Sequence, residues 1–188
     1  YGLRARPRET AAFDAPQIGT FLHFLLENVT RDVLAEGGFA AVEQEELHRL
    51  VRRYTERYVE QELHNFQNRN ARFRYLFARL RTTAYAVIDQ VAAELRCSDF
   101  VPMAFELSFG GKNGALSAVT ISEPDGELRV GGKVDRVDGW LHDGRLYLRV
   151  VDYKSGRKSF DLANVRMGLD IQMLLYLFTL QKEGARYF

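Results

Sequence analysis

The pattern of apolar and polar positions along the chain changes its period near the middle. Residues 17–37 carry apolar side chains at helical spacing, and these form one stripe made of Ile18, Leu22, Leu25, Leu26, Val29 and Val33. Asp14 suits the N-cap of this helix, with Pro16 in its first turn. Residues 42–63 and 70–95 have the same periodicity and are heavily charged on one side. The first half therefore predicts three long helices.

The second half alternates apolar and polar residues instead, and this two-residue period is typical of strands. Four segments show it, separated by glycine-rich or Asp-Gly turns: residues 100–110, 116–122, 128–141 and 145–155. Residues 162–184 return to helical spacing and predict a closing helix. We therefore expect an α+β fold, in which a small mixed sheet is flanked by helices.

The length of 188 residues suits one domain. Within that domain we expect a mainly helical part in residues 1–98, and a sheet with its closing helix in residues 99–188. The chain opens on Tyr1 without a methionine, and we expect it to be a piece of a larger subunit.

A short turn predicts how the last two strands pair. Asp143-Gly144 is a favoured two-residue hairpin loop, so the residues on either side face each other in order. That register places Asp135 opposite Asp152 on one face of the sheet. It also pairs Asp138 with Arg149, which carry opposite charges, and Trp140 with Tyr147.

Two opposed carboxylates in a sheet repel each other, and Lys154 follows Asp152 on the same face. A divalent cation would offset this repulsion, and oxygen ligands favour Mg²⁺ or Mn²⁺. A lysine beside such an ion can hold a water or neutralise charge on a phosphate. The alternative is a solvated patch in which Lys154 merely neutralises Asp135 and Asp152.

Composition adds few constraints to this picture. The apolar and charged fractions, 46% and 27%, are those of an ordinary globular protein, and a net charge of +1 gives no global sign of nucleic-acid binding. No apolar run approaches the length of a membrane span, and no signal-peptide pattern opens the chain. Cys97 is the single cysteine, which excludes a disulfide framework and favours a reducing, intracellular location. We interpret Cys97 as an ordinary small apolar residue.

The stretches "GKVDRVDGW" and "LRVVDYKSG" resemble the core of the RecB-type PD-(D/E)XK nucleases. The resemblance continues outside these strands, because the family also has a histidine on an early helix and a Gln-x-x-x-Tyr motif on the helix after the lysine strand. The matching residues are His23 in "IGTFLHFLLENV", and Gln172 and Tyr176 in "QMLLY". The resemblance implies the restriction-endonuclease-like fold, with an N-terminal helical portion.

The flanking segments, from "YGLRARPRE" to "QKEGARYF", are similar to the nuclease domain of AddB-type subunits of bacterial helicase–nucleases. This resemblance implies that His23, Asp135, Asp152 and the Tyr153 backbone carbonyl bind Mg²⁺ or Mn²⁺, and that Asp135, Asp152 and Lys154 are catalytic. Gln172 and Tyr176 would contact DNA or support the site. The family's iron–sulfur cluster uses cysteines that lie outside this chain, so we expect the cluster only in the full-length subunit.

The activity that the resemblance implies is Mg²⁺-dependent exonucleolytic cleavage of DNA. The substrate would be single strands unwound by a partner helicase subunit, in double-strand break repair, and the location the bacterial cytoplasm. Two alternatives remain: a nuclease-like module that only binds DNA or scaffolds a complex, and a stand-alone nuclease of the CRISPR-adaptation type.

Other polar residues allow two interpretations each. Glu106 is a supporting acid or an additional metal ligand, or else a solvent-facing strand residue. His48 and His64 lie in charged helices and are interpreted as solvent-facing, and His142 lies beside the turn. The arginine-rich helix either lines a phosphate channel or presents a solvated or subunit-facing surface; its arginines are Arg69, Arg72, Arg74, Arg79 and Arg81.

Overall fold

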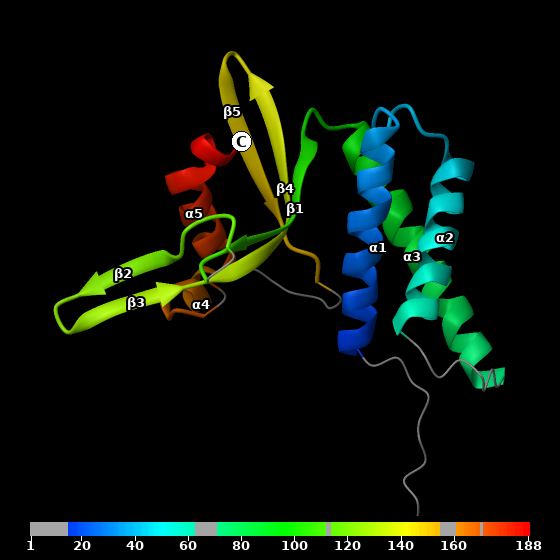
Figure 1. Ribbon diagram of the computed structural model, residues 1–188, viewed down its shortest axis with the longest axis horizontal. Coiled ribbons are helices and arrows are strands. Elements are labelled where there is room, and N and C mark those ends of the chain that lie inside the picture. The colour runs from blue at the N-terminus through cyan, green and yellow to red at the C-terminus, as the bar shows by residue number, and fades with distance from the viewer. Residues whose placement is uncertain (1–14, 63–70, 112–113, 155–160, 170) are drawn as a thin grey trace, which may run out of the picture.

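The computed structural model describes residues 15–62, 71–111, 114–154, 161–169 and 171–188. Three long helices come first in the chain: α1 (Ala15–Ala35), α2 (Gln44–Glu62) and α3 (Ala71–Arg96). They pack side by side at one end of the molecule, with α1 next to the sheet (Figure 1). Their apolar stripes form one core that includes Leu25, Val29, Leu50 and Ile88. The three predicted helices are therefore present.

The second half of the chain contains a three-stranded sheet with strand order β1-β4-β5. Its strands are β1 (Val101–Phe109), β4 (Gly132–His142) and β5 (Arg145–Val151), and both pairings are antiparallel. The α+β fold is thus confirmed, although the described strands of this sheet are antiparallel rather than mixed.

The hairpin register between β4 and β5 is the predicted one. His142 pairs with Arg145, which leaves Asp143 and Gly144 as the loop, both with positive φ (49° and 71°). The expected pairs Asp138–Arg149 and Trp140–Tyr147 are present. The ladder ends at the pair Arg136–Val151, so Asp135 and Asp152 lie one position beyond it. The strand predicted for residues 145–155 therefore ends earlier than expected.

The strand predicted for residues 128–141 is two strands. β3 (Gly126–Val130) pairs with β2 (Val119–Glu123) in a separate hairpin, which extends away from the main sheet (Figure 1). The strand is interrupted at Gly131, where an added Cβ would lie 2.9 Å from the Phe109 carbonyl oxygen. The close approach of two backbones explains both the glycine and the break.

The prediction of a single closing helix over residues 162–184 is also wrong in detail, because this segment contains two helices. α4 (Leu162–Arg166) begins at Asp161, whose side chain accepts a hydrogen bond from the Ala163 amide, and ends at Met167. Gly168 then takes φ of +77°, a conformation that ends a helix, and α5 (Gln172–Tyr187) starts separately. Gln172 consequently lies at the first position of α5, beside the sheet.

α5 covers one face of the sheet with an apolar cluster. Val137 on β4 and Leu148 and Val150 on β5 pack with Tyr176 and Leu180 of α5. The helix approaches β5 closely, because a Cβ at Gly184 would lie 3.0 Å from the Leu148 side chain.

A bulge interrupts the pairing of β1 with β4. Val101 pairs with Gly139 and Pro102 with Asp138, but the next pair is Ala104 with Val137, so Met103 is the additional residue. The Met103 side chain fills the space that Gly139 leaves, where an added Cβ would lie 2.0 Å from its sulfur.

Among the described residues, no helix combines the length and the apolar character needed to cross a bilayer.

Candidate metal centre

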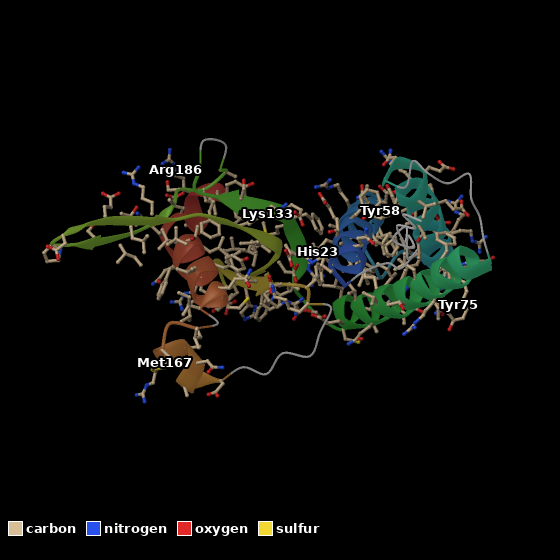
Figure 2. All side chains as sticks on the ribbon, turned by 90° about the horizontal axis from the view of Figure 1, so that it is seen from below. His23, Tyr58, Tyr75, Lys133, Met167 and Arg186 are labelled. Atoms are coloured by element: carbon tan, nitrogen blue, oxygen red, sulfur yellow. The ribbon has the colours of Figure 1, made fainter. Side chains whose placement is uncertain are left out.

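Three potential metal ligands from three different elements meet between α1 and the sheet. They are His23 on α1, Glu106 on β1 and Asp135 on β4, and one ligand atom from each lies within 4.8 Å of the others. His23 Nδ1 is 3.4 Å from Asp135 Oδ1 and 3.7 Å from Glu106 Oε1. Figure 2 shows His23 at the boundary between the helices and the sheet. The structure thus brings two of the predicted ligands together and adds Glu106.

The backbone of β1 turns Glu106 towards this group. Glu106 has φ of 50°, which is uncommon for a residue other than glycine and costs about 1–3 kcal/mol. The buried positions of β1 are even-numbered before Glu106, at Pro102 and Ala104, and odd-numbered after it, at Leu107 and Phe109. In a regular strand, every second residue would stay on the buried face throughout. The sequence pattern therefore did not reveal which way Glu106 points.

Tyr153 links both sides of the centre through its main chain. Its amide donates to Asp135 Oδ2 at 2.6 Å, and its carbonyl oxygen is 3.2 Å from His23 Nε2. When His23 Nε2 carries the proton, it donates to this carbonyl, and the unprotonated Nδ1 faces the carboxylates of Glu106 and Asp135. Three electron-rich atoms then face one another, an arrangement that a bound cation would stabilise.

Asp152 and Lys154 form a second group beside the first. Lys154 Nζ is 2.7 Å from Asp152 Oδ2, and it donates to Gln172 Oε1 at 3.2 Å. Gln172 Nε2 is 3.4 Å from Asp152 Oδ1 and also contacts the Tyr176 hydroxyl. In the part of the chain that the structure describes, Asp152 does not belong to the three-residue group of possible ligands. That Asp135 and Asp152 share one ion stays a prediction.

Tyr176 is buried and holds this second group against the sheet. Its hydroxyl donates to the Lys133 carbonyl oxygen at 2.8 Å, and its ring packs edge-on against Phe109. The Gln-x-x-x-Tyr motif therefore joins α5 to β4 next to Asp152. The structure places Gln172 and Tyr176 beside Asp152. That these two residues contact DNA or support the site stays a prediction.

Charge is tightly paired in this region. Burial raises the pKa of the Asp135 carboxyl, and although the Tyr153 amide and His23 lower it, Asp152 and Glu106 raise it further. The hydrogen bond with Asp152 raises the pKa of Lys154, and the Glu106 carboxylate raises the pKa of Lys133, which it contacts. Both lysines are therefore cationic beside three carboxyl groups.

The residues present fit a divalent cation. An imidazole nitrogen and two carboxylates from separate elements converge, and burial penalises an unneutralised charge on Asp135. Oxygen-rich sets of this kind suit Mg²⁺ or Mn²⁺.

Sequence reasoning missed the partners of Lys133 and Arg136. Lys133 contacts Glu106, and Arg136 contacts Asp138 and Tyr153. A signal was available for Arg136, because Arg136 and Asp138 are two positions apart on one strand and so share a face. The contact between Lys133 and Glu106 depends on the conformation of Glu106, which no local pattern indicates.

Several other expectations were wrong or lie outside the described residues. His48 is not solvent-facing: it is half-buried, 2.8 Å from Asp89 Oδ1, and packs against Tyr85. Cys97 is exposed, so it is not a packing residue. His64 and Arg69 lie outside the described residues, as do the side chains of Arg72 and Arg74. Arg79 is exposed, and its role stays open.

A family model described as the PD-(D/E)XK nuclease superfamily matches residues 1–187. The chain is also 31% identical over 179 residues to the B subunit of the ATP-dependent helicase/deoxyribonuclease of Caldanaerobacter subterraneus subsp. tengcongensis, covering 94% of this chain and 15% of that protein. Proteins with the same name from Exiguobacterium sibiricum and Acetivibrio thermocellus are each 32% identical, over 100% and 98% of this chain and 16% of their own length.

This chain therefore spans about one sixth of the length of these curated relatives, and the region of similarity is essentially the whole of the fold described above. Because the family model matches residues 1–187, the chain belongs to the PD-(D/E)XK nuclease superfamily.

Proposed function

We propose that this chain is one metal-dependent deoxyribonuclease domain, formed by residues 1–188 together, that hydrolyses phosphodiester bonds of DNA. The observation that supports this proposal best is the pairing of Lys154 with Asp152 directly beside the His23, Glu106 and Asp135 group. A bound cation and a separate ammonium group can each stabilise the charge that develops on a phosphate during hydrolysis.

The proposed ligands are His23, Asp135 and Asp152 with the Tyr153 carbonyl, and we now add Glu106. His23, Glu106 and Asp135 support this set by their mutual distances. The inclusion of Asp152 is supported by its negative charge, which acts on Asp135. We propose Mg²⁺ as the physiological ion, with Mn²⁺ as a substitute.

A bound divalent cation would supply Lewis-acid polarisation of the scissile phosphate and would acidify the attacking water. Lys154 would hold its ammonium group beside that phosphate and offset the negative charge that develops in the transition state. Gln172 would orient Lys154 and Asp152 together, because its amide contacts both. Tyr176 would fix Gln172 by anchoring α5 to the Lys133 carbonyl.

The biological setting is proposed from the names of the relatives together with the resemblance to AddB-type subunits. Those proteins are the B subunits of ATP-dependent helicase/deoxyribonucleases. We propose that this domain acts as an exonuclease on single strands unwound by a partner helicase subunit, in double-strand break repair in the bacterial cytoplasm. An iron–sulfur cluster is expected in the full-length subunit and not in this chain.

Cleavage of end-labelled single-stranded DNA with and without Mg²⁺ tests the proposal. Asp152→Asn and Lys154→Ala should each lower the cleavage rate at least about 100-fold, because each removes a charged group from the reacting centre. Lys182→Ala, on an exposed part of α5, should cleave at the wild-type rate.

Cleavage at near wild-type rate in either site variant would contradict the assignment of this site. Wild-type protein that binds the DNA but does not cleave it would instead favour the alternative of a nuclease-like binding module.

A further inference from the structure

Arg136 is a fully buried charged side chain in the middle of the sheet. Each of its guanidinium nitrogens has a partner. Nε donates to Asp138 Oδ1 at 2.7 Å, Nη2 donates to Asp138 Oδ2 at 3.0 Å, and Nη1 donates to the Tyr153 hydroxyl at 2.6 Å. A guanidinium is a planar, rigid donor group, so three simultaneous bonds fix its position closely.

Asp138 is equally buried and holds a second arginine. It accepts from Arg149 Nε at 3.0 Å and from Arg149 Nη2 at 2.7 Å. Arg149 Nη1 is in turn 2.8 Å from Glu94 Oε1 on α3. The sheet is thereby tied to the helical bundle by directional, charge-assisted bonds.

Burying such a network is a poor way to gain stability, because removing charges from water offsets most of the attraction between them. The network does hold the hydroxyl of Tyr153 in one position. Tyr153 lies beyond the end of β5, so no ladder of backbone hydrogen bonds holds it there. Its hydroxyl is anchored by Arg136, and its ring packs against the core of the helical bundle.

The main chain of Tyr153 is where this anchor meets the candidate metal centre. The amide donates to Asp135, the carbonyl contacts His23, and the adjacent residues are Asp152 and Lys154. A displacement of the Tyr153 main chain therefore changes the separation between the ligand group and the Asp152–Lys154 pair.

We propose that Arg136, held by Asp138 and Arg149, is a positioning residue that sets the geometry of the metal centre through the Tyr153 hydroxyl. The inference rests on the proposed function, since it assumes that the centre binds a divalent cation. The Arg136 side chain contacts neither a ligand atom nor the reacting atoms, and it acts only through the Tyr153 hydroxyl.

Tyr153→Phe tests this directly, because it removes the hydroxyl and leaves the ring in place. Mn²⁺ affinity, measured by the electron paramagnetic resonance signal of free Mn²⁺, should fall about 10-fold or more, as is typical when a partner of a metal ligand is removed. Hydrogen exchange of the residue 153 amide in the metal-free protein should become faster, because its bond to Asp135 loosens. The cleavage rate at saturating Mn²⁺ should also fall.

Two control variants separate positioning from simple loss of stability. Tyr147→Phe removes the hydroxyl of an exposed tyrosine on β5, the strand that leads to Tyr153, and should leave Mn²⁺ affinity and exchange unchanged. Ile88→Ala lowers stability by opening a cavity in the core of the helical bundle, and it removes no member of the Arg136, Asp138, Arg149 and Tyr153 network. It should lower the melting temperature at least as much as Tyr153→Phe without changing Mn²⁺ affinity in the folded protein.

The positioning role is overturned if Tyr153→Phe binds Mn²⁺ as the wild type does, or if Ile88→Ala weakens Mn²⁺ binding equally. In both cases wild-type cleavage would still support the proposed function. Wild-type protein that neither binds Mn²⁺ nor cleaves DNA would overturn the proposed function, and the positioning role with it.

Discussion

The two faces of the β1-β4-β5 sheet are held in opposite ways. Towards α5 the contacts are apolar, with Val137 and Val150 paired across the strands and Leu180 above them. Towards the helical bundle the sheet presents the buried ions Arg136 and Asp138. Apolar contact is non-directional and tolerates small displacements, whereas bidentate ionic bonds do not. The comparison indicates that the α5 face mainly stabilises the fold, whereas the bundle face fixes the positions of residues at the candidate site.

The largest effect is expected on the ionic face. Asp138→Asn removes the carboxylate that lies between two guanidinium groups and should lower the free energy of unfolding by about 3–5 kcal/mol, because it leaves the buried Arg136 without an anionic partner. Urea denaturation measures this. Asp143→Asn is the matched control: its side chain is 87% exposed, and asparagine tolerates the positive φ of 49°. Equal stability of the two variants would remove the distinction between the faces.

On the apolar face, Leu180→Ala should lower the free energy of unfolding by about 2–4 kcal/mol, since it opens a cavity under α5. Mn²⁺ affinity of the folded protein should stay at the wild-type value, in contrast to variants of the ionic face. Leu177→Ala, an exposed leucine on the same helix, should change neither quantity appreciably. Weakened Mn²⁺ binding in Leu180→Ala would show that the apolar face also positions the site.

The smallest effect concerns alkaline pH. Burial raises the pKa of Tyr153 from about 10 to about 12, with the charge of Arg136 acting in the opposite direction. The folded state therefore favours the neutral phenol more than the unfolded chain does. That contribution is complete below pH 10, and it is lost as the pH rises from about 10 through about 12, at a cost of about 2 kcal/mol.

Denaturation at pH 9 and pH 11.5 measures this loss as a difference between wild type and Tyr153→Phe, because other groups also titrate there. The wild type should lose more stability than the variant over this interval. Parallel losses in both proteins would contradict the raised pKa and with it the burial of the phenol.

The sequence predicted those parts of the fold that local rules determine. A two-residue Asp-Gly loop allows one register, so the pairs Asp138–Arg149 and Trp140–Tyr147 followed from it. The break at Gly131 and the separate α4 and α5 were missed, although Gly131 and Gly168 were visible in the sequence. A glycine permits a break without requiring one, and at Gly131 the cause is the distant Phe109 carbonyl.

The sequence named the candidate site residues but did not predict the contacts between them. Residues near the hairpin, such as Asp135, could be placed by register, and His23 and Gln172 by resemblance. The orientation of Glu106 depends on its positive φ, and the bond between Arg136 and Tyr153 depends on how the chain leaves β5. Both arise from tertiary packing, which the periodicity of a segment does not contain.

The bulge at Met103 has a consequence for how this protein can change over evolutionary time. The side chain of Met103 occupies the volume that Gly139 leaves vacant, so a side chain added at position 139 displaces the end of the Met103 side chain. A larger residue at position 139 is therefore accommodated best together with a smaller one at position 103, because residues in contact are coupled. Related chains should therefore show positions 103 and 139 varying together.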